Sequence, residues 1–229
     1  ARDAGARAVT VTVDDVARAR AGRLYRPGAD EHYDQVSAFI KSVRGSDPDA
    51  GLYWLARMLE AGEDARFVAR RLVILASEDV GMADPAGLVV ADAAARAVEM
   101  VGLPEAALNL AHAVVYLATA PKSNRVTVAL DRARADVRSG AGGEVPAHLR
   151  DAHYKGAEAL GHGAGYRYPH DFPGGWVDQQ YRPGGVDRHA YYEPSGEGAE
   201  REVSDRLASR RRPPSGEPRS GGREGDQAG

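Results

Sequence analysis

A lysine followed by a hydroxyl side chain, as in Lys122-Ser123, is where phosphate chemistry would be expected. A Walker A loop needs Gly-x4-Gly-Lys-Ser/Thr, because its backbone N–H groups wrap the phosphates while the lysine reaches them. Pro121 stands where that motif demands glycine, so this pair is not such a loop. The glycine-rich run 161–165 superficially suggests a dinucleotide loop. It fails because Tyr166 takes the place of the third glycine and no βαβ unit surrounds it.

Five histidines lie in the C-terminal third of the chain. They are His148, His153, His162, His170 and His189. A metal site would place two of them four residues apart on a helix, or would add a carboxylate partner, and the first two are five apart. We therefore expect exposed or hydrogen-bonded loop histidines and assign no metal ligand. The chain has no cysteine, which excludes disulfides, thiolate zinc sites and cysteine nucleophiles.

The paired carboxylates Glu78-Asp79 near a helix end have two interpretations. They suit a general acid/base site. They equally suit a capping or salt-bridged feature, which is the commoner use of such residues. No Ser/His/Asp arrangement stands out. We assign no catalytic residue and no cofactor-binding residue.

Two basic clusters are the candidate sites for contacts with DNA or with another subunit. On one expected helix, two arginines share a face at i and i+4, either to bind phosphate or to form salt bridges. The other cluster is placed in the first turn of a helix expected to open at Pro121, where helix N-termini bind anions readily. The candidate residues are Arg66, Arg70, Lys122, Ser123, Asn124 and Arg125.

Helical periodicity and stop signals place these residues in an all-α fold. Val36, Phe39, Ile40 and Val43 share one helical face. Pro or Asp-Pro opens several segments and glycine closes them. We expect helices from about 31 to 45, 47 to 62, 68 to 81, 84 to 102, from 104 onward, and from 121 to 140. The sixth carries an apolar stripe of Val126, Ala129, Leu130, Ala133 and Val137. Short connections predict a compact bundle of about six to seven helices.

The flanking segments differ in composition. An extended segment at 9–13 and a short helix at 14–21 are expected at the start, with the bundle at 23–160. Residues 161–210 form an irregular Gly/Pro/aromatic segment whose rings we expect to be buried on the bundle. A disordered tail follows at 211–229. The 229 residues carry a net charge of -3 and a mean hydropathy of -0.45. No apolar stretch approaches the roughly 20 residues that span a bilayer, and no export signal is seen, which fits the cytoplasm.

Several blocks, in order, carry a family resemblance. They are 32–34, Ser37–Ala50, Leu52–Met58, 68–72, Ala76–Gly81, Val115–Ala118, Ala120–Asn124, Val145–Arg150 and Tyr168–Asp171. From about residue 8 to 193 the chain resembles the C-terminal half of the replication-associated recombination protein A family. That family is also called maintenance-of-genome-stability protein A, and it includes the Werner-helicase-interacting ATPase.

The resemblance implies a clamp-loader-like AAA+ ATPase of the nucleoid. Its ATP and Mg²⁺ would bind in an N-terminal core that this sequence does not contain, and residues 1–22 would be the end of that core's lid. It implies further that the helical region 23–160 forms homotetramers. The whole protein would act at stalled forks and bind DNA, and some members associate with single-stranded-DNA-binding protein.

Three hypotheses follow. The first is an oligomerisation module without ATPase activity of its own. The second is a module that binds single-stranded or junction DNA through basic helix ends. The third is an unrecognised enzyme.

Overall fold

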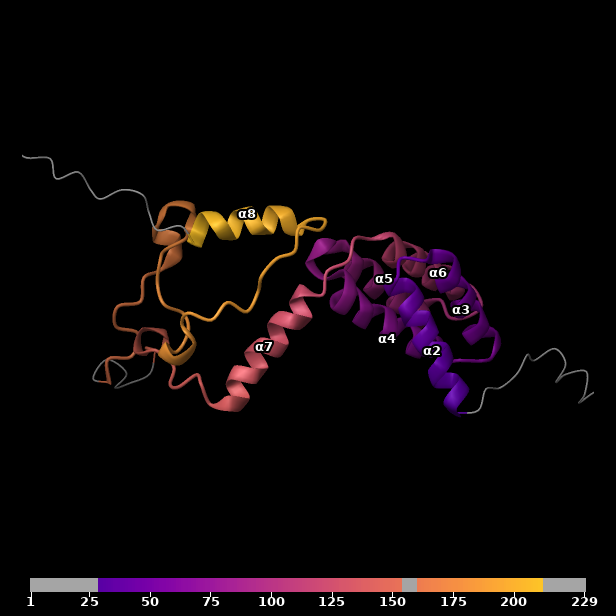
Figure 1. Ribbon diagram of the computed structural model, residues 1–229, viewed down its shortest axis with the longest axis horizontal. Helices are drawn as coiled ribbons and strands as arrows, with labels where there is room; N and C mark the ends of the chain where they lie inside the picture. The colour runs from indigo at the N-terminus through magenta and orange to yellow at the C-terminus, as the bar shows by residue number, and fades with distance from the viewer. Residues whose placement is uncertain (1–28, 154–159, 212–229) are drawn as a thin grey trace, which may run out of the picture. The chain divides into compact units, whose positions relative to one another are not determined.

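A computed structural model describes residues 29–153 and 160–211 (Figure 1). This part of the chain contains seven α-helices and no strand, which confirms the predicted all-α class. The expected segments at 9–13 and 14–21, and with them the expected lid remnant, lie outside the described residues, as does the expected tail from 212 on. No helix in the described part is long and apolar enough to cross a membrane.

The described chain divides into two compact units. The first contains residues 29–128 and 197–199, and the second contains 129–153, 160–196 and 200–211. The boundary falls inside one helix, α7 (Arg125–Ser139). The candidate surfaces described below are formed by residues of the first unit.

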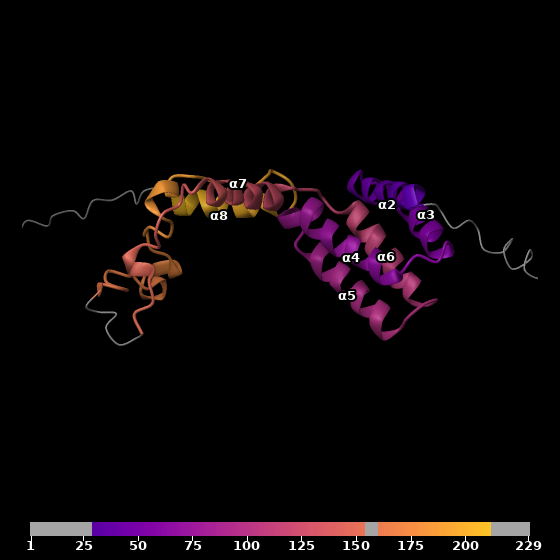
Figure 2. The same ribbon diagram turned by 90° about the horizontal axis from the view of Figure 1, so that it is seen from below.

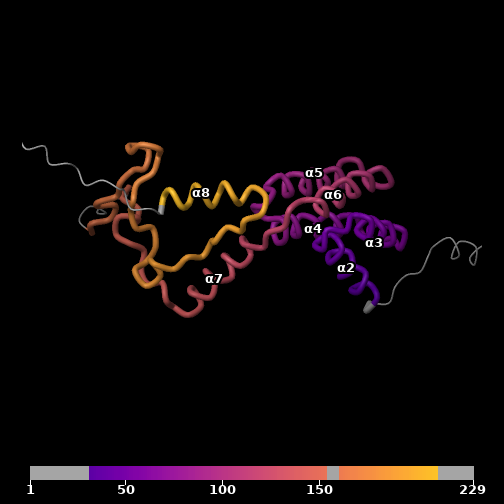
Figure 3. The backbone as a smooth tube through the Cα atoms, turned by 45° about the horizontal axis from the view of Figure 1, so that its top comes forward, coloured from indigo at the N-terminus to yellow at the C-terminus, as the bar shows by residue number. Residues whose placement is uncertain are grey.

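The first unit is a helical bundle with short connections (Figures 2 and 3). Its helices are α2 (Ala29–Arg44), α3 (Pro48–Glu60), α4 (Ala65–Leu75), α5 (Ala86–Met100) and α6 (Ala106–Thr119). A π-helical turn, Ala76–Val80, and a 3-10 turn, Gly81–Ala83, join α4 to α5. Helices α5 and α6 pack together as a hairpin, and α3 packs against both α2 and α6.

The core of the first unit consists of apolar side chains from its helices, and it includes part of the stripe predicted for α2. Phe39 and Val43 of α2 are fully buried. Leu55, Met58, Leu72, Leu75, Leu110, Val114 and Leu117 complete the core from the other helices. Burying one such side chain stabilises the fold by about 1.5–3 kcal/mol, so these side chains are the main source of its stability.

The expected helix starts are confirmed at two Asp-Pro pairs. The Asp47 carboxylate accepts a hydrogen bond from the Ala50 N–H at 2.9 Å and caps α3. The Asp84 carboxylate accepts one from the Ala86 N–H at 3.1 Å. Each carboxylate satisfies a backbone donor that the first helical turn leaves without a partner.

The sixth expected helix differs from its prediction. Helix α7 starts at Arg125, four residues after Pro121, and none of its residues is buried. Leu130 and Val137, which we expected in the core, are exposed. Periodicity identifies an apolar face but not whether other residues cover it, so the prediction was right about the helix and wrong about its burial.

The second unit combines 3-10 turns with one further α-helix. The turns are Ala147–Leu149, Pro169–Asp171, Pro173–Gly175 and Gly184–Val186. Helix α8 (Glu200–Arg211) contradicts the prediction of irregular structure to residue 210 and of a tail from 211. Its sequence is mostly polar, and Val203 and Leu207 give it only a short apolar face, so its helical periodicity is weak. It is supported by charge pairs such as Arg206–Glu202, 3.7 Å apart.

The rings of the aromatic segment are only partly buried. Tyr166, Tyr168 and Tyr181 are exposed, so the expectation of burial is wrong for these three. Val177 and Val186 are the buried apolar side chains of this segment. Its packing on the bundle stays a prediction.

Candidate interaction surfaces

The two arginines singled out on α4 have different surroundings. The Arg66 guanidinium forms an exposed ion pair with Glu99 of α5, with Nε and Oε1 2.7 Å apart. The Arg70 guanidinium lies over the Phe67 ring, 5.4 Å from its centroid. The charge of Arg66 is therefore neutralised by Glu99 at the surface, and the Arg70 guanidinium forms a cation–π contact with the Phe67 ring.

The Lys122 side chain forms hydrogen bonds within the first unit. Its Nζ donates hydrogen bonds to the Ala118 carbonyl at 3.0 Å, the Ala120 carbonyl at 2.6 Å and the Ser46 hydroxyl at 3.1 Å. Burial lowers the pKa of Lys122, and the nearby charge of Asp79 opposes that shift. The ammonium group therefore caps the C-terminal end of α6.

The neighbours of Lys122 lie in an extended loop before α7, and only Arg125 belongs to the helix. The buried Ser123 donates its N–H to the Asp79 carbonyl at 2.7 Å. The Ser123 hydroxyl accepts a hydrogen bond from the Arg125 N–H at 3.3 Å. Asn124 is exposed. The structure thus brings 122 and 123 together as parts that fasten the loop to the bundle.

The carboxylates of the π-helical turn form an ion-pair cluster. The Arg44 Nε donates to Asp79 Oδ1 at 2.6 Å, and its Nη2 lies 3.5 Å from Glu78 Oε1. The hydrogen bond to Asp79 raises the pKa of Arg44. This arrangement matches the salt-bridged interpretation of Glu78-Asp79 and joins α2 to the turn after α4.

His148 and His189 are each hydrogen-bonded to a group other than histidine. His148 bonds to the Gln180 carbonyl at 2.7 Å, and His189 to the Asp136 carboxylate at 2.7 Å. Among the described residues no three His, Asp or Glu side chains are grouped to hold a metal ion.

A surface that the sequence analysis missed lies at the α5–α6 turn. Met100, Val101, Leu103 and Leu108 expose apolar side chains there, with Met100 88% and Leu108 75% exposed. We call these four residues the apolar patch. Leu110, Val114 and Leu117 of α6 are buried in the core, whereas Leu108 of the same helix is exposed.

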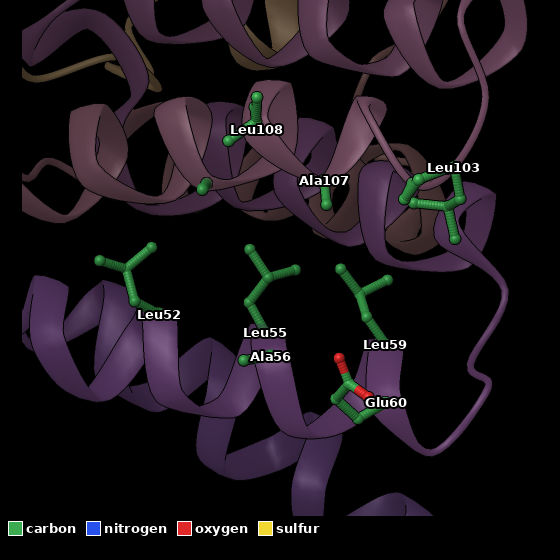
Figure 4. Close-up of a pocket in the computed structure, with 10 residues that line it drawn as sticks. Leu52, Leu55, Ala56, Leu59, Glu60, Leu103, Ala107 and Leu108 are labelled. Carbon is green, nitrogen blue, oxygen red and sulfur yellow. The ribbon is translucent and has the colours of Figure 1, made fainter. Parts of the chain in front are cut away.

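The apolar patch continues into a groove between α3 and α6, the α3–α6 groove, with a volume of about 500 Å³. In Figure 4, Leu52, Leu55 and Leu59 of α3 point toward α6, which contributes Ala107 and Leu108 to the lining. Leu103 closes one end, and Glu60 is the charged residue on the lining. Monomeric proteins rarely expose a continuous apolar surface without a use for it.

A second groove, of about 530 Å³, lies between α2 and α4; we call it the α2–α4 groove. In the part of the chain that the structure describes, its walls carry basic and aromatic side chains and no acidic one. They include His32, Tyr33, Lys41, Arg44, Phe67 and Arg71. Sequence analysis paired Arg66 with Arg70. The spacing that faces this groove is Phe67 and Arg71, also at i and i+4 on α4.

The comparisons with known proteins place this chain. The family model described as MgsA AAA+ ATPase C terminal matches residues 45–211. The chain belongs to this family. The MgsA C-terminal match extends from the end of α2 to the end of α8, so it includes both walls of the α3–α6 groove. The predicted resemblance is confirmed.

Relatives with the same C-terminal region come from distant organisms. An uncharacterized AAA domain-containing protein of Mycobacterium tuberculosis is 59% identical over 199 residues, 86% of this chain and 44% of the relative. Replication-associated recombination protein A of Bacillus subtilis is 50% identical over 187 residues, 80% and 44%. The ATPase WRNIP1 of Dictyostelium discoideum is 41% identical over 175 residues, 76% and 20%. The chain spans less than half of each.

Proposed function

We propose that this chain is the self-association module of a clamp-loader-like AAA+ ATPase that acts in DNA replication, recombination and repair at stalled forks. The assembly we propose is a homotetramer. In it the copies gather ATPase cores, which bind ATP and Mg²⁺, while this chain alone hydrolyses no ATP. The observation that carries the proposal is the apolar patch and the adjoining α3–α6 groove.

The patch and groove suit a second copy of the chain for a physical reason. The patch projects apolar side chains, and the groove beside it is lined by leucine and alanine from two helices. Each copy therefore carries both a projecting apolar surface, the apolar patch, and an apolar groove, the α3–α6 groove. Symmetric oligomers are built by repeating one such contact between identical surfaces.

Light scattering of the chain, and of Leu108→Glu beside it, tests the proposal. We expect the wild-type chain to have the mass of a tetramer at about ten micromolar or above. Leu108→Glu should lower that mass, because a carboxylate buried in an apolar contact costs several kcal/mol. The matched control is Val137→Glu on α7, where the side chain is 79% exposed and where we expect an unchanged mass.

Two results would contradict this proposal. One is a wild-type chain that stays monomeric at these concentrations. The other is a tetramer whose mass is the same in Leu108→Glu and in Val137→Glu. Circular dichroism of both variants checks that their helices are retained.

A further inference from the structure

The α2–α4 groove holds positive charge that the described part of the chain does not neutralise. Two of its cations are already engaged, Arg44 with Asp79 and Glu78, and His32 with Glu63 at 2.8 Å. Lys41 and Arg71 form no ion pair with any described residue. These two are the charges that a ligand would meet.

Of these two residues, Arg71 gives the stronger indication of a ligand. Its Nε is buried and has no hydrogen-bond partner within the described residues. A buried donor without a partner costs about 1–3 kcal/mol, so such a group usually has a use. The Arg71 guanidinium lines the groove and forms no hydrogen bond with another described residue, so its remaining N–H groups can donate to a phosphate oxygen there.

The same groove carries aromatic rings. Tyr33 of α2 is 72% exposed. The His32 ring packs edge-on to the Tyr33 ring and tilted against the Phe67 ring, with centroids 5.6 Å apart in both pairs. Tyr33 is therefore an open ring held in place by its neighbour, next to two uncompensated cations.

We infer that the α2–α4 groove binds single-stranded nucleic acid, with Lys41 and Arg71 on phosphates and a base stacked on Tyr33. Proteins that hold single strands without sequence preference combine a cationic groove with exposed aromatic rings. An acidic peptide would satisfy the cations but would leave the open Tyr33 ring unused. This surface is distinct from the apolar patch, so the inference does not depend on self-association.

The α2–α4 groove also differs from the basic clusters that the sequence suggested. There the Lys122 ammonium bonds inside the bundle and Arg66 is paired with Glu99. In the groove, Lys41 and Arg71 have no such partner among the described residues. We therefore place the contact with DNA on α2 and α4 and not at the start of α7.

Fluorescence anisotropy with a labelled oligo-dT of about 12 nucleotides tests the site on the full chain. The double variant Lys41→Ala/Arg71→Met removes both charges and keeps the aliphatic stem of Arg71. We expect binding about tenfold weaker at low salt, and a log–log salt dependence shallower by about 0.7 for each phosphate that the variant no longer binds. Tyr33→Leu should weaken binding about fivefold or more without changing that salt dependence.

Matched controls remove the same groups elsewhere. Arg66→Met/Arg96→Ala takes two positive charges from α4 and α5 outside the groove, and Tyr53→Leu removes an exposed ring from α3. Both should bind like wild type. Light scattering should show an unchanged mass for every groove variant.

Three results would overturn the inference. They are oligonucleotide affinity that is equal in the groove variants and their controls, absence of binding by the wild-type chain at low salt, and displacement of the oligonucleotide by an equal concentration of a poly-glutamate peptide. A free mononucleotide that competes as strongly as the oligonucleotide would also count against a strand as the ligand.

Discussion

Glu200 is a fully buried carboxylate, and it accepts hydrogen bonds from groups of the second unit. The Tyr192 hydroxyl donates to its Oε1 at 2.8 Å, and the Ser195 N–H donates to its Oε2 at 2.7 Å. The Ser195 hydroxyl also donates to Oε2. A charge taken out of water needs such partners, because an unpaired one costs several kcal/mol.

Tyr192 should respond to this carboxylate in an alkaline titration. Burial, together with the hydrogen bond to Glu200 and its charge, raises the pKa of Tyr192 from 10.0 to about 12. Because the folded pKa lies above the unfolded one, the stabilisation is complete below pH 10 and is lost as pH rises toward about 12.

Absorbance of tyrosinate measures this directly. Subtracting the titration of Tyr192→Phe from that of the wild-type chain should leave one ionisation near pH 12. A difference curve with its midpoint at 10 would show that the hydroxyl is not held as described.

The helices differ in how well local sequence predicts where they start and whether they are buried. Asp47 caps α3 through the Ala50 N–H, and Pro48 occupies the first turn. Both are local signals, and the helix starts where they predict. By contrast, no local signal in α7 predicts that its residues stay exposed, and none in α8 predicts that this segment is helical. The sequence-based expectations were wrong about burial for α7 and about helix formation for α8.

Replacing Asp47 tests the local signal. Asp47→Ala should lower the free energy of unfolding by about 1 kcal/mol, because the first turn of α3 loses the acceptor for its N–H. Asp47→Asn retains an acceptor oxygen and is the matched control, with a loss close to zero. Urea denaturation followed by circular dichroism gives both values; equal losses in the two variants would be inconsistent with a capping role.

For the molecule as a whole, the two proposed surfaces depend on different interactions, which respond differently to salt. The apolar patch works by removing apolar area from water, which salt does not weaken. The α2–α4 groove works through phosphate charge, and salt weakens such binding steeply. The surfaces lie on different helix pairs of the first unit, so one can be changed without the other.

Salt should therefore separate the two activities in one sample. Raising it from about 0.05 to 0.2 M should leave the mass by light scattering unchanged while oligonucleotide binding falls by about sevenfold, the loss that two phosphate contacts predict. The same titration with Leu108→Glu should show the lower mass and the same loss of binding. A mass that falls along with binding would mean that charge pairs, and not the apolar patch, hold the copies together.

Local sequence signals were enough to establish the all-α class, five helices of the first unit, two of their caps and part of the core. These depend on helical periodicity and on side chains that bond to nearby backbone. The family resemblance also came from the order of sequence blocks. None of this required knowing which helices are neighbours.

The packing of the helices was needed to show which remaining residues face outward together. Gly51 shows the reason: a Cβ there would lie 2.9 Å from Val114 Cγ1 and 3.2 Å from Val43 Cγ2. That close approach of α3 to α6 and α2 is invisible along the chain. The two grooves and the hydrogen bond from Lys122 to Ser46 likewise join residues far apart in sequence, and periodicity within one helix carries no information about them.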